Sequence, residues 1–437
     1  MTSQDRWLLP EGVDELLPQQ AAVAEQVRRD ILDLYKTWGY QLVVPPLVEF
    51  TDSLLIGMGD DVAHQSFRLT DQLSGKPMAI RADITPQTAR IDAHSMRATG
   101  TNRLCYAGSV LHTRPSAPLA SRCPMQAGAE LYGDAGLDAD IEIISLMLAM
   151  LQAVDARYAR GPGNGGKGLH RLTLDLGHVG IYRTVLAVID SLQPSLHDDA
   201  KVLIEDALQR KSVTELRELA PKLITDKQLV EIICQLPLLC GDRHVLDDAR
   251  ELLQGLEALY QSSAAAGIET IDIAKQITGA LDELAGVADV IALRFPEVGI
   301  YFDLTELRGY AYHTGLVFAA YADGHGSALA NGGRYDDVGQ VFGAARPATG
   351  FNTDVKTLIN FIYGDESAGL SPSDGENADG VVEKIQAIAA PIIHDAALWE
   401  EVQALRAQGK IVVNVQAQQL DHYQQRLVFT SDGWVVR

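Results

Sequence analysis

Cysteine is scarce in this sequence, and its few cysteines stand far apart. Four occur in 437 residues, at Cys105, Cys123, Cys234 and Cys240, and none belongs to a paired CxxC zinc motif. Four scattered thiols are also too few for a disulfide framework. We therefore predict reduced, packed cysteines and no metal site.

Long apolar runs are absent as well. No stretch of about 18 apolar residues occurs, and the N-terminal sequence MTSQDRWLLPEG lacks the basic and apolar regions of a signal peptide. This pattern predicts a protein that does not cross a membrane and resides in the cytoplasm.

Basic residues are under-represented. The 36 Lys and Arg residues face 58 Asp and Glu residues, which leaves a net charge of −22. The average field repels the phosphate backbone that a nucleic-acid-binding protein must neutralise, although a local basic groove stays compatible with this average. The charge therefore counts against binding of tRNA without excluding it.

The chain is nevertheless rich in core-forming residues, with 47% hydrophobic content. Its length predicts two or three domains. Apolar spacing predicts a helix over 19–37, a strand over 41–50, a hairpin over 67–83, a helix over 84–96, strands near 103–114 and 124–133, and a long helix over 138–159. Hairpins followed by helices favour an α+β fold with an antiparallel sheet.

The second half divides by composition. Strand signals nearly vanish from Pro194 to about Gly286, which predicts a helical insertion. A segment rich in Gly, Ser and Asp then predicts a linker. The predicted boundaries are core 1–193, helical insertion 194–290, core 291–363, linker 364–380 and a small C-terminal α/β domain 381–437.

Two motifs indicate a family. Residues 306–318 read ELRGYAYHTGLVF and residues 326–336 read GSALANGGRYD. They resemble the R-G-L-D-Y-Y-T-G and G-G-G-R-Y-D motifs of histidyl-tRNA synthetase, with Tyr310, Ala311 and His313 at three altered positions. The resemblance implies a class II aminoacyl-tRNA synthetase-like core, antiparallel sheet flanked by helices, and a homodimer built on the region of Pro45 and Pro46.

The same resemblance implies a pocket for free histidine. IRADITPQTAR is similar to the family's L-R-P-E-G-T, and MQAGAE is similar to its H-Q-x-x-x-E, while Arg308 occupies the position that meets the substrate carboxylate. The residues carried over as histidine-binding are Asp83, Thr85, Gln126, Glu130, Arg308, Tyr312 and His313. Taken singly, Asp83 also fits a helix N-cap, Glu130 a half-exposed strand residue, Arg308 a partner of Glu306 and His313 a structural residue.

The positions that serve ATP in that family have changed. His112 replaces the Arg of the second motif, and GFNTDVKT replaces G-F-x-x-G-x-E-R, with Asp354, Lys356 and Thr357 at its altered positions. A neutral imidazole cannot replace a fixed bidentate cation, although Arg114 lies two residues further on. We therefore expect no catalytic residues and no cofactor. GPGNGGKG at 161–168 fails as a phosphate-binding loop because Gly168 stands where Ser or Thr is needed.

A synthetase-like core with a histidine pocket, altered ATP positions and an acidic, shortened C-terminal domain resembles the regulatory subunit of ATP phosphoribosyltransferase. Residues 365–437 carry eleven carboxylates and five basic residues, a composition poorly suited to tRNA. The resemblance implies activation of a short-form ATP phosphoribosyltransferase catalytic subunit in a hetero-octamer, with feedback inhibition by histidine. The alternatives are a divergent histidyl-tRNA synthetase and an amino-acid sensor for another partner.

Overall fold

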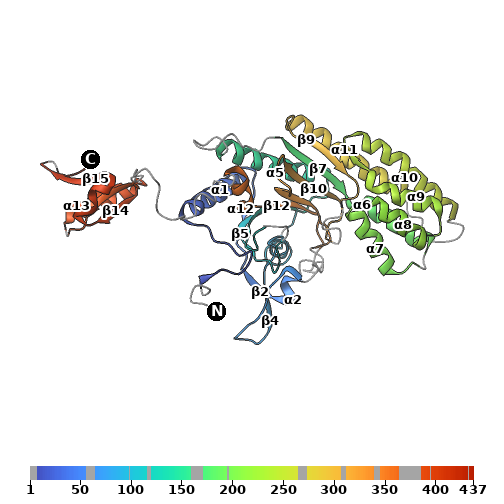
Figure 1. Ribbon diagram of the computed structural model, residues 1–437, viewed down its shortest axis with the longest axis horizontal. Coiled ribbons are helices and arrows are strands. Elements are labelled where there is room, and N and C mark those ends of the chain that lie inside the picture. Colours follow the sequence, from blue (N-terminus) through green and yellow to red (C-terminus); the bar gives the residue numbers. More distant parts are fainter. Residues whose placement is uncertain are drawn as a thin grey trace. The chain divides into compact units, whose positions relative to one another are not determined.

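The computed structural model divides into two compact units, Met1–Gly369 and Leu370–Arg437 (Figure 1). The structure describes residues 7–55, 64–97, 99–115, 120–158, 171–193, 196–263, 273–306, 312–338, 345–363, 385–393, 395–431 and 433–437. Arg308, the segment 161–168 and the predicted linker 364–380 lie outside these residues.

A nine-stranded sheet is the centre of the described part of the first unit. In spatial order its strands are β1 (Gln41–Leu42), β5 (Asn102–Ser109), β6 (Met125–Tyr132), β12 (Ala348–Asp354), β11 (Ala330–Arg334), β10 (Leu316–Ala322), β7 (Leu172–His178), β9 (Gly299–Asp303) and β8 (Cys240–Gly241). β1 pairs with β5 and β7 with β9 in parallel, and the other neighbours are antiparallel. The predicted antiparallel sheet flanked by helices is confirmed, with these two parallel exceptions.

Helices cover the sheet through apolar stripes. The first, α1 (Pro18–Thr37), buries Ala24, Val27, Ile31 and Tyr35, a spacing of three to four residues that places them on one side of a helix. It ends before Gly39, whose φ of 85° suits glycine. Together with α5 (Leu137–Tyr158) and α12 (Val355–Tyr363), α1 packs on the central strands.

Strand β6 separates this core from the opposite face of the sheet. Its residues Ala127, Ala129 and Leu131 join the main hydrophobic core. Since successive side chains of a strand alternate, Gln126 and Glu130 point to the other face. The polar site described below is built on that other face.

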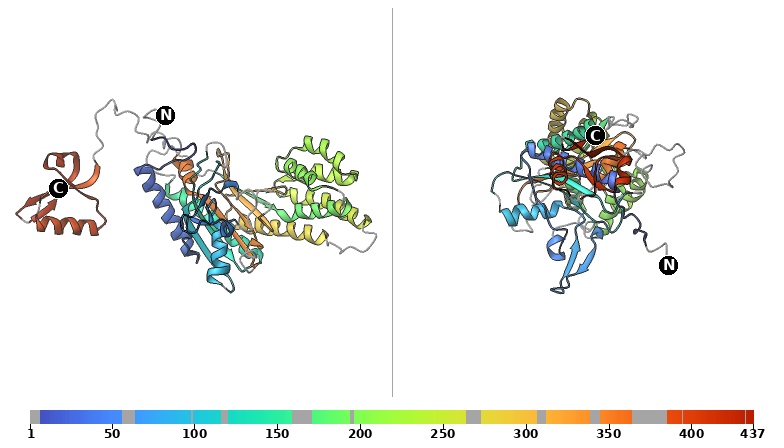
Figure 2. Two further views of the ribbon diagram at one scale, coloured as in Figure 1. Left: turned by 90° about the horizontal axis from the view of Figure 1, so that it is seen from below. Right: turned by 90° about the vertical axis from the view of Figure 1, so that its left-hand side faces the viewer.

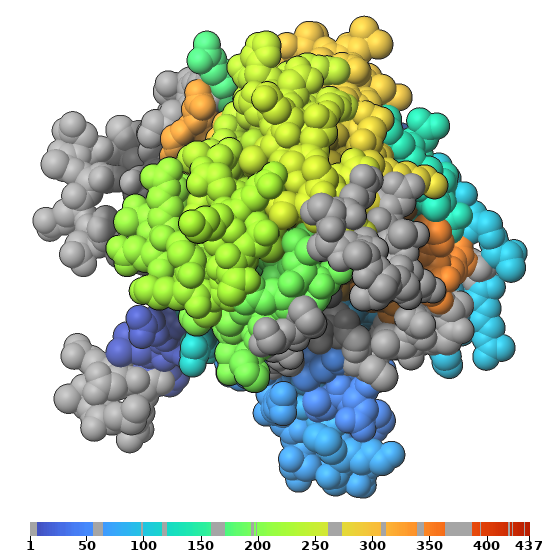
Figure 3. Space-filling model, turned by 90° about the vertical axis from the view of Figure 1, so that its right-hand side faces the viewer, coloured from blue at the N-terminus to red at the C-terminus, as the bar shows by residue number. Residues whose placement is uncertain are grey.

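The predicted strand over 41–50 is wrong in one respect, because it is two short strands in different sheets. β1 joins the large sheet, whereas β2 (Val48–Phe50) lies in a three-stranded sheet with β4 (Pro77–Ile80) and β3 (Arg68–Thr70). Pro45 and Pro46 lack the N–H groups that a continuous ladder needs. The carbonyl of Pro45 instead accepts a hydrogen bond from Nη1 of Arg81 at 2.9 Å. The β3–β4 hairpin projects from the unit (Figures 1 and 3).

Helices dominate the stretch between β7 and β9. They are α6 (Val179–Leu192), α7 (Asp198–Gln209), α8 (Val213–Leu223), α9 (Lys227–Gln235), α10 (His244–Ser263) and α11 (Ile273–Arg294). α7 to α10 gather at one end of the unit and form most of the face shown in Figure 3 (Figures 2 and 3). The range 194–290 predicted as an insertion contains α7 to α10 and most of α11, whose last turn continues to Arg294.

Short elements also occur in the described part of the first unit, among them a 3-10 helix at Leu236–Leu238. α2 (Thr51–Leu54) follows β2, and α4 (Thr85–Arg90) runs on into a π-helical turn at Ile91–Met96. The helix predicted over 84–96 is thereby present. No helix among the described residues has the length and apolar content needed to cross a bilayer.

The second unit has a core of its own. Its sheet has the order β14 (Val412–Val415), β13 (Ile385–Pro391), β15 (Tyr423–Thr430) and β16 (Gly433–Val436), with α13 (Ala396–Ala407) packed against it. β15 and β16 form an antiparallel hairpin, in which Thr430 pairs with Gly433, the first residue of β16, whose φ is 102°.

Candidate functional site

An inner cavity of about 180 Å³ lies on the polar face of the sheet. Its lining comes from the start of α4 and the segment before it, from β6, from the segment after Arg308, from β11 and the residue that follows it, and from β12. The lining residues are Asp83, Thr85, Glu130, Tyr312, His313, Asn331, Gly332, Gly333, Tyr335, Gly350, Phe351 and Asn352. Asp83, Thr85, Glu130, Tyr312 and His313, all predicted from sequence, are therefore brought together here.

Glu130 is the buried acid of this cavity. Its residue surface is 1% exposed. Oε1 accepts a hydrogen bond from the Tyr106 hydroxyl at 3.0 Å, and Oε2 accepts one from the Tyr335 hydroxyl. The Tyr106 hydroxyl also lies 2.9 Å from Oγ1 of Thr85. Two tyrosines thus hold the carboxyl group in a fixed orientation.

The protonation of Glu130 is unusual for a glutamate. Burial raises its pKa to about 8, and the nearby Asp83 acts in the same direction, while the tyrosine hydroxyls lower the pKa. The hydrogen bonds from the two tyrosines stabilise the ionised carboxylate, but they do not fully compensate for the hydration that it loses on burial. A ligand that brings an N–H group to Glu130 would favour its ionised form.

An aromatic wall closes one side of the cavity. The ring of Tyr312 stacks on Tyr335, with centroids 5.0 Å apart and planes at 29°, and meets His313 edge-on at 5.4 Å. The Tyr312 hydroxyl is buried and has no hydrogen-bond partner among the described residues. Since a buried, unpaired hydroxyl is costly, it points to a ligand or water that completes its bonding.

Asp83 and Gln126 form a polar pair at the edge of this cavity. Oδ1 of Asp83 accepts hydrogen bonds from the Gln126 amide at 2.8 Å and from the backbone N–H of Thr85 at 3.0 Å. Oε1 of Gln126 accepts one from the backbone N–H of Ile84 at 2.8 Å. Asp83 therefore contacts the first residue of α4 and lines the cavity, but the N-cap of α4 is Ile84 and no side chain caps the helix, so the interpretation of Asp83 as an N-cap is wrong.

The position of His313 is fixed through its backbone. Nη2 of Arg183, on α6, donates a hydrogen bond to the carbonyl of His313 at 2.6 Å. Two residues further on, the carbonyl of Gly315 accepts a hydrogen bond from the backbone N–H of Val179, the first residue of α6. Helix α6, which precedes α7 in the chain, thus contacts the wall of the inner cavity.

Gly350 makes room for Glu130. The two residues are register partners on β12 and β6, and a Cβ at position 350 would lie 1.6 Å from Oε2 of Glu130. No side chain fits at that distance, so the buried acid depends on this glycine.

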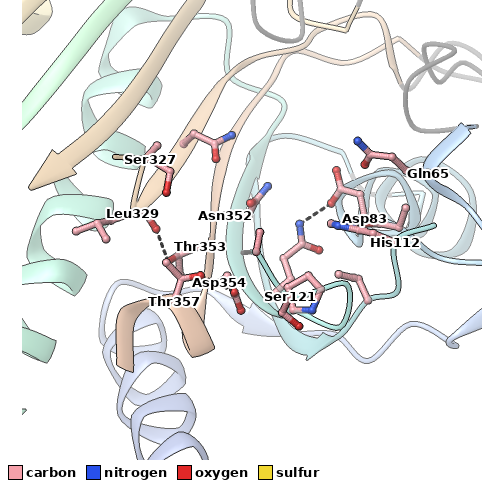
Figure 4. A pocket seen from close by; sticks show the side chains of 17 residues that line it. Gln65, Asp83, His112, Ser121, Ser327, Leu329, Asn352, Thr353, Asp354 and Thr357 are labelled. Atoms are coloured by element: carbon pink, nitrogen blue, oxygen red, sulfur yellow. Dashed lines mark hydrogen bonds between the residues drawn. The ribbon is translucent and has the colours of Figure 1, made fainter. Parts of the chain in front are cut away.

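An outer cavity of about 390 Å³ adjoins the inner one and shares Asp83, Asn331 and Asn352 with it (Figure 4). Gln65 and Ser327 lie on opposite sides of it. Its other lining residues are Ala82, Val110, His112, Ala120, Ser121, Pro124, Gln126, Ala328, Leu329, Thr353, Asp354 and Thr357. The predicted site residue Gln126 lines this outer cavity. Its side-chain amide donates a hydrogen bond to Asp83, which lines both cavities.

The altered ATP positions belong to the outer cavity. Nε2 of His112 bonds the carbonyl of Ala82 at 2.9 Å, and Oγ1 of Thr357 donates to Oδ2 of Asp354 at 2.7 Å. Lys356 instead pairs with Asp14 at 3.0 Å, and Arg114 is exposed and absent from the lining. Neither Lys nor Arg occurs among the described lining residues, so none of these residues offers a fixed cation to a phosphate.

Sequence reasoning missed several contributors to the inner cavity. Tyr335 lies within the quoted GSALANGGRYD motif, yet its hydrogen bond to Glu130 follows from the folding of β11 beside β12 and leaves no signal in the spacing. Tyr106, Asn331, Asn352 and Gly350 were missed for the same reason. Arg308 could not be placed, since it lies outside the described residues.

One carboxylate cluster has the proximity of a metal site. Asp175, Asp303 and Glu306 have ligand atoms within 4.8 Å of one another. Lys211 forms an ion pair with Asp303, which supplies a positive charge at the cluster from the protein itself. We assign no metal to it.

Comparisons with family models and with known proteins show which family the chain belongs to. Residues 12–358 match the family model described as histidyl-tRNA synthetase, and residues 385–437 match the one described as ATP phosphoribosyltransferase subunit HisZ C-terminal domain. The chain is 42% identical over 442 residues to an ATP phosphoribosyltransferase regulatory subunit of Teredinibacter turnerae, covering 100% of both chains. It is 44% identical over 442 residues to the protein of that name from Azotobacter vinelandii, covering 100% of this chain and 99% of the relative.

Solved structures show the same fold. An ATP phosphoribosyltransferase regulatory subunit/histidyl-tRNA synthetase from Bacillus halodurans superposes with a TM-score of 0.70 at 23% identity, covering 96% of this chain and 97% of the other. Histidyl-tRNA synthetase from Nostoc sp. PCC 7120 gives a TM-score of 0.67 at 18% identity, covering 98% and 92%. The predicted class II synthetase-like core is thereby confirmed.

Proposed function

The chain belongs to the family of ATP phosphoribosyltransferase regulatory subunits, and on that premise we propose that it binds free histidine and relays this signal to a short-form catalytic subunit. It is a regulatory subunit and not itself a catalyst. In the proposed assembly it activates the catalytic subunit, and histidine reverses the activation. We further propose a homodimer within a hetero-octamer, a cytoplasmic location and no role for tRNA.

One observation carries the histidine proposal. The inner cavity combines a buried carboxyl group, Glu130, with a buried hydroxyl, Tyr312, that lacks a partner among the described residues. An imidazole ring has one N–H donor and one nitrogen acceptor, or two donors when charged. In the proposed complex, Glu130 accepts a hydrogen bond from one ring nitrogen of histidine. The Tyr312 hydroxyl forms a hydrogen bond with the other ring nitrogen.

The remaining groups suit the amino-acid end of histidine. Asp83 lies at the edge of the cavity, where its carboxylate can accept hydrogen bonds from the α-ammonium group. The cavity of about 180 Å³ is smaller than the 300 to 1,000 Å³ usual for drug-sized ligands, which matches a single amino acid. We propose that Arg308 meets the carboxylate of histidine, on its motif position alone.

The proposed link to the partner is thermodynamic. Histidine needs only to bind the less active state of the assembly more tightly than the active state, and a difference of about 1 to 3 kcal/mol gives useful inhibition. α6 is a candidate for the physical connection, because Arg183 holds the cavity wall and its helix leads to α7.

The test is reconstitution with the short-form catalytic subunit, following phosphoribosyl-ATP formation with and without histidine. Activation that histidine reverses is the expected result. Glu130→Gln should raise the half-inhibitory histidine concentration at least about tenfold, since a hydrogen bond to a charged group contributes about 1.5 to 3 kcal/mol. Glu218→Gln, an exposed substitution on α8, is the matched control. Histidine sensitivity unchanged in Glu130→Gln would remove the assignment.

A second assay separates the alternatives. A divergent histidyl-tRNA synthetase would catalyse histidine-dependent exchange between ATP and pyrophosphate. We expect no such exchange, because no described residue that lines the outer cavity supplies a cation for the phosphates.

A further inference from the structure

The helical insertion holds the end of β9. Asp303, the last residue of β9, is the register partner of Cys240 on β8, which belongs to the insertion. The backbone N–H of Leu304 donates a hydrogen bond to the carbonyl of Leu239 at 3.1 Å. Further along the chain, His313 lines the inner cavity. The insertion therefore contacts the chain shortly before it reaches the proposed histidine site.

A side chain of the insertion also holds Asp303. Nζ of Lys211, in the turn between α7 and α8, donates to Oδ2 of Asp303, whose side chain is 7% exposed. Oδ1 of Asp303 accepts hydrogen bonds from the backbone N–H and the hydroxyl of Thr305, both at 3.2 Å. Both oxygens of this buried carboxylate are therefore bonded, and Lys211 supplies its counter-charge. Removing the partner of a buried charge is costly.

The backbone of Lys211 does not by itself favour lysine. Its φ is 52°, in the left-handed region that residues with a Cβ adopt at a cost. Its N–H donates to the carbonyl of Leu208 at 2.9 Å, where α7 has just ended. Glycine suits this conformation better. What the lysine adds at this turn is the ion pair with Asp303.

The cation of Lys211 offsets a convergence of three carboxylates. Oxygens of Asp175, Asp303 and Glu306 lie within 4.8 Å of one another. Asp175 and Glu306 also line a third cavity, of about 130 Å³, and His313 lines both this cavity and the inner one. Repulsion among the carboxylates would therefore act beside a wall of the proposed histidine site.

The turn after β9 is packed closely against the large sheet. The N–H of Glu306 donates to the carbonyl of Asp303 at 3.2 Å. A Cβ at Gly177, on β7, would lie 2.7 Å from that carbonyl oxygen and 3.0 Å from Cβ of Glu306. Gly177 is the register partner of Val317 on β10, which lines the third cavity. A shift of Asp303 would thus press on the strands beside His313.

We propose that Lys211 is a positioning residue for the histidine site, and that its ion pair with Asp303 couples the helical insertion to the inner cavity. Lys211 is not among the described residues that line the inner or the third cavity, so it acts through the turn that leads to Tyr312 and His313. Since coupling is reciprocal, bound histidine in turn stabilises the insertion in the position that keeps the ion pair. This inference rests on the proposed function and adds a second connection to that of Arg183.

The test is calorimetric titration of the full-length protein with histidine. Lys211→Gly removes the ammonium group and suits the left-handed turn, so it separates loss of the ion pair from damage to the turn. It should weaken histidine at least about fivefold, whereas Lys211→Arg keeps the cation and should stay within about twofold of the wild type. Arg210→Ala is the matched control, because the neighbouring guanidinium pairs with Asp206 and Glu215 instead.

Three results of this titration would overturn the proposal. One is an unchanged histidine affinity in Lys211→Gly. Another is an equal loss in Lys211→Gly and Lys211→Arg, because the charge would then be irrelevant. The third is an equal loss in Arg210→Ala, which would show that any change at this turn has the same effect.

Hydrogen exchange without histidine tests the positioning itself. The backbone N–H of Thr314, next to His313, donates to the carbonyl of Arg334 at 2.7 Å. Its exchange should be at least about fivefold faster in Lys211→Gly than in the wild type and Lys211→Arg. Unchanged exchange would overturn the inference even where wild-type protein binds histidine. A wild type that binds no histidine would instead remove the proposed function, and the exchange contrast would still decide whether Lys211 positions this segment.

Discussion

Glu130 shows at the scale of one residue how a binding site costs stability. A carboxyl group that is 1% exposed has lost most of its hydration, and the hydroxyls of Tyr106 and Tyr335 return only part of it. The pKa therefore rises to about 8 from its ordinary value of 4.5. Perturbed acids of this kind cluster at functional sites, which supports assigning the cavity to a ligand.

The raised pKa gives a signed prediction for stability. The folded state holds the Glu130 proton more tightly than the unfolded chain, so this stabilisation is complete below pH 4.5 and is lost as the pH rises through about 8. The contribution falls by up to about 1.4 kcal/mol per pH unit within that window. Glu130→Gln keeps the neutral form and should flatten the dependence, measured by urea unfolding from pH 5 to 8. Parallel curves for the two proteins would contradict a protonated Glu130.

The two stacked tyrosines should respond differently to loss of their hydroxyls. The buried Tyr312 hydroxyl has no described partner, so Tyr312→Phe should not lower the free energy of unfolding and should weaken histidine roughly fivefold. Tyr335→Phe removes a donor to Glu130 and should cost about 1 to 3 kcal/mol of stability. Thermal unfolding and calorimetric titration of both variants check this contrast. Equal destabilisation by the two substitutions would be the contrary result.

The sequence predicted part of this site for a clear reason. Asp83, Glu130 and Tyr312 stand in motifs whose order along the chain can be compared with a known family. Tyr335 and Asn352 act through strand neighbours, and neither spacing nor composition reveals which strands become neighbours. Their contributions became visible only with the sheet order.

At the scale of elements, the contact between β6 and β12 sets the space available to the acid. Gly350 faces Glu130, whereas its neighbour Phe351 packs into the core against Tyr35 with ring centroids 5.9 Å apart. At these two adjacent positions β12 thus supplies a large residue to one face of the sheet and only a hydrogen atom to the other. A small shift of β12 would alter both the core and the cavity.

Gly350→Ala should therefore be among the most damaging single-methyl additions in the protein. Its Cβ would lie 1.6 Å from Oε2 of Glu130 and 2.9 Å from the backbone oxygen of Ala129, so either the acid or the strand must move. We expect at least about 2 kcal/mol of destabilisation with loss of histidine binding. Gly279→Ala on α11 is the matched control, because nothing lies within 4 Å of its Cβ, and it should stabilise by about 0.5 to 1 kcal/mol. Thermal unfolding of both variants checks the ordering, and a neutral Gly350→Ala would contradict the tight packing.

The prediction of helices and strands succeeded where apolar residues recurred at the spacing of a single type of element. The regular apolar stripe of α1 and the long apolar run of α5 gave helices with nearly the observed bounds. It failed at 41–50, where one apolar stretch contains two short strands that belong to different sheets. Pro45, Pro46 and the buried Arg81 that binds the Pro45 carbonyl make that change, and Arg81 lies more than thirty residues away.

At the scale of the whole molecule, the two units have separate hydrophobic cores. All buried residues of the main cluster precede residue 363, while the cluster of the second unit contains only residues from 388 onward. The proposed histidine site lies in the first unit. The domain boundaries at 364–380 stay predictions, since that segment is outside the described residues.

Deletion of residues 370–437 should therefore leave ligand binding intact. The remaining chain keeps every described lining residue of both cavities and the full main core, so its histidine affinity should stay within about twofold of the wild-type value, measured by calorimetry. Activation of the catalytic subunit, assayed on the same preparation, then reports what the second unit contributes to the partner. Retained histidine binding with lost activation would assign partner contact to the second unit. Lost histidine binding in a folded truncation would instead show that the site depends on the second unit, contrary to the separation of the two cores.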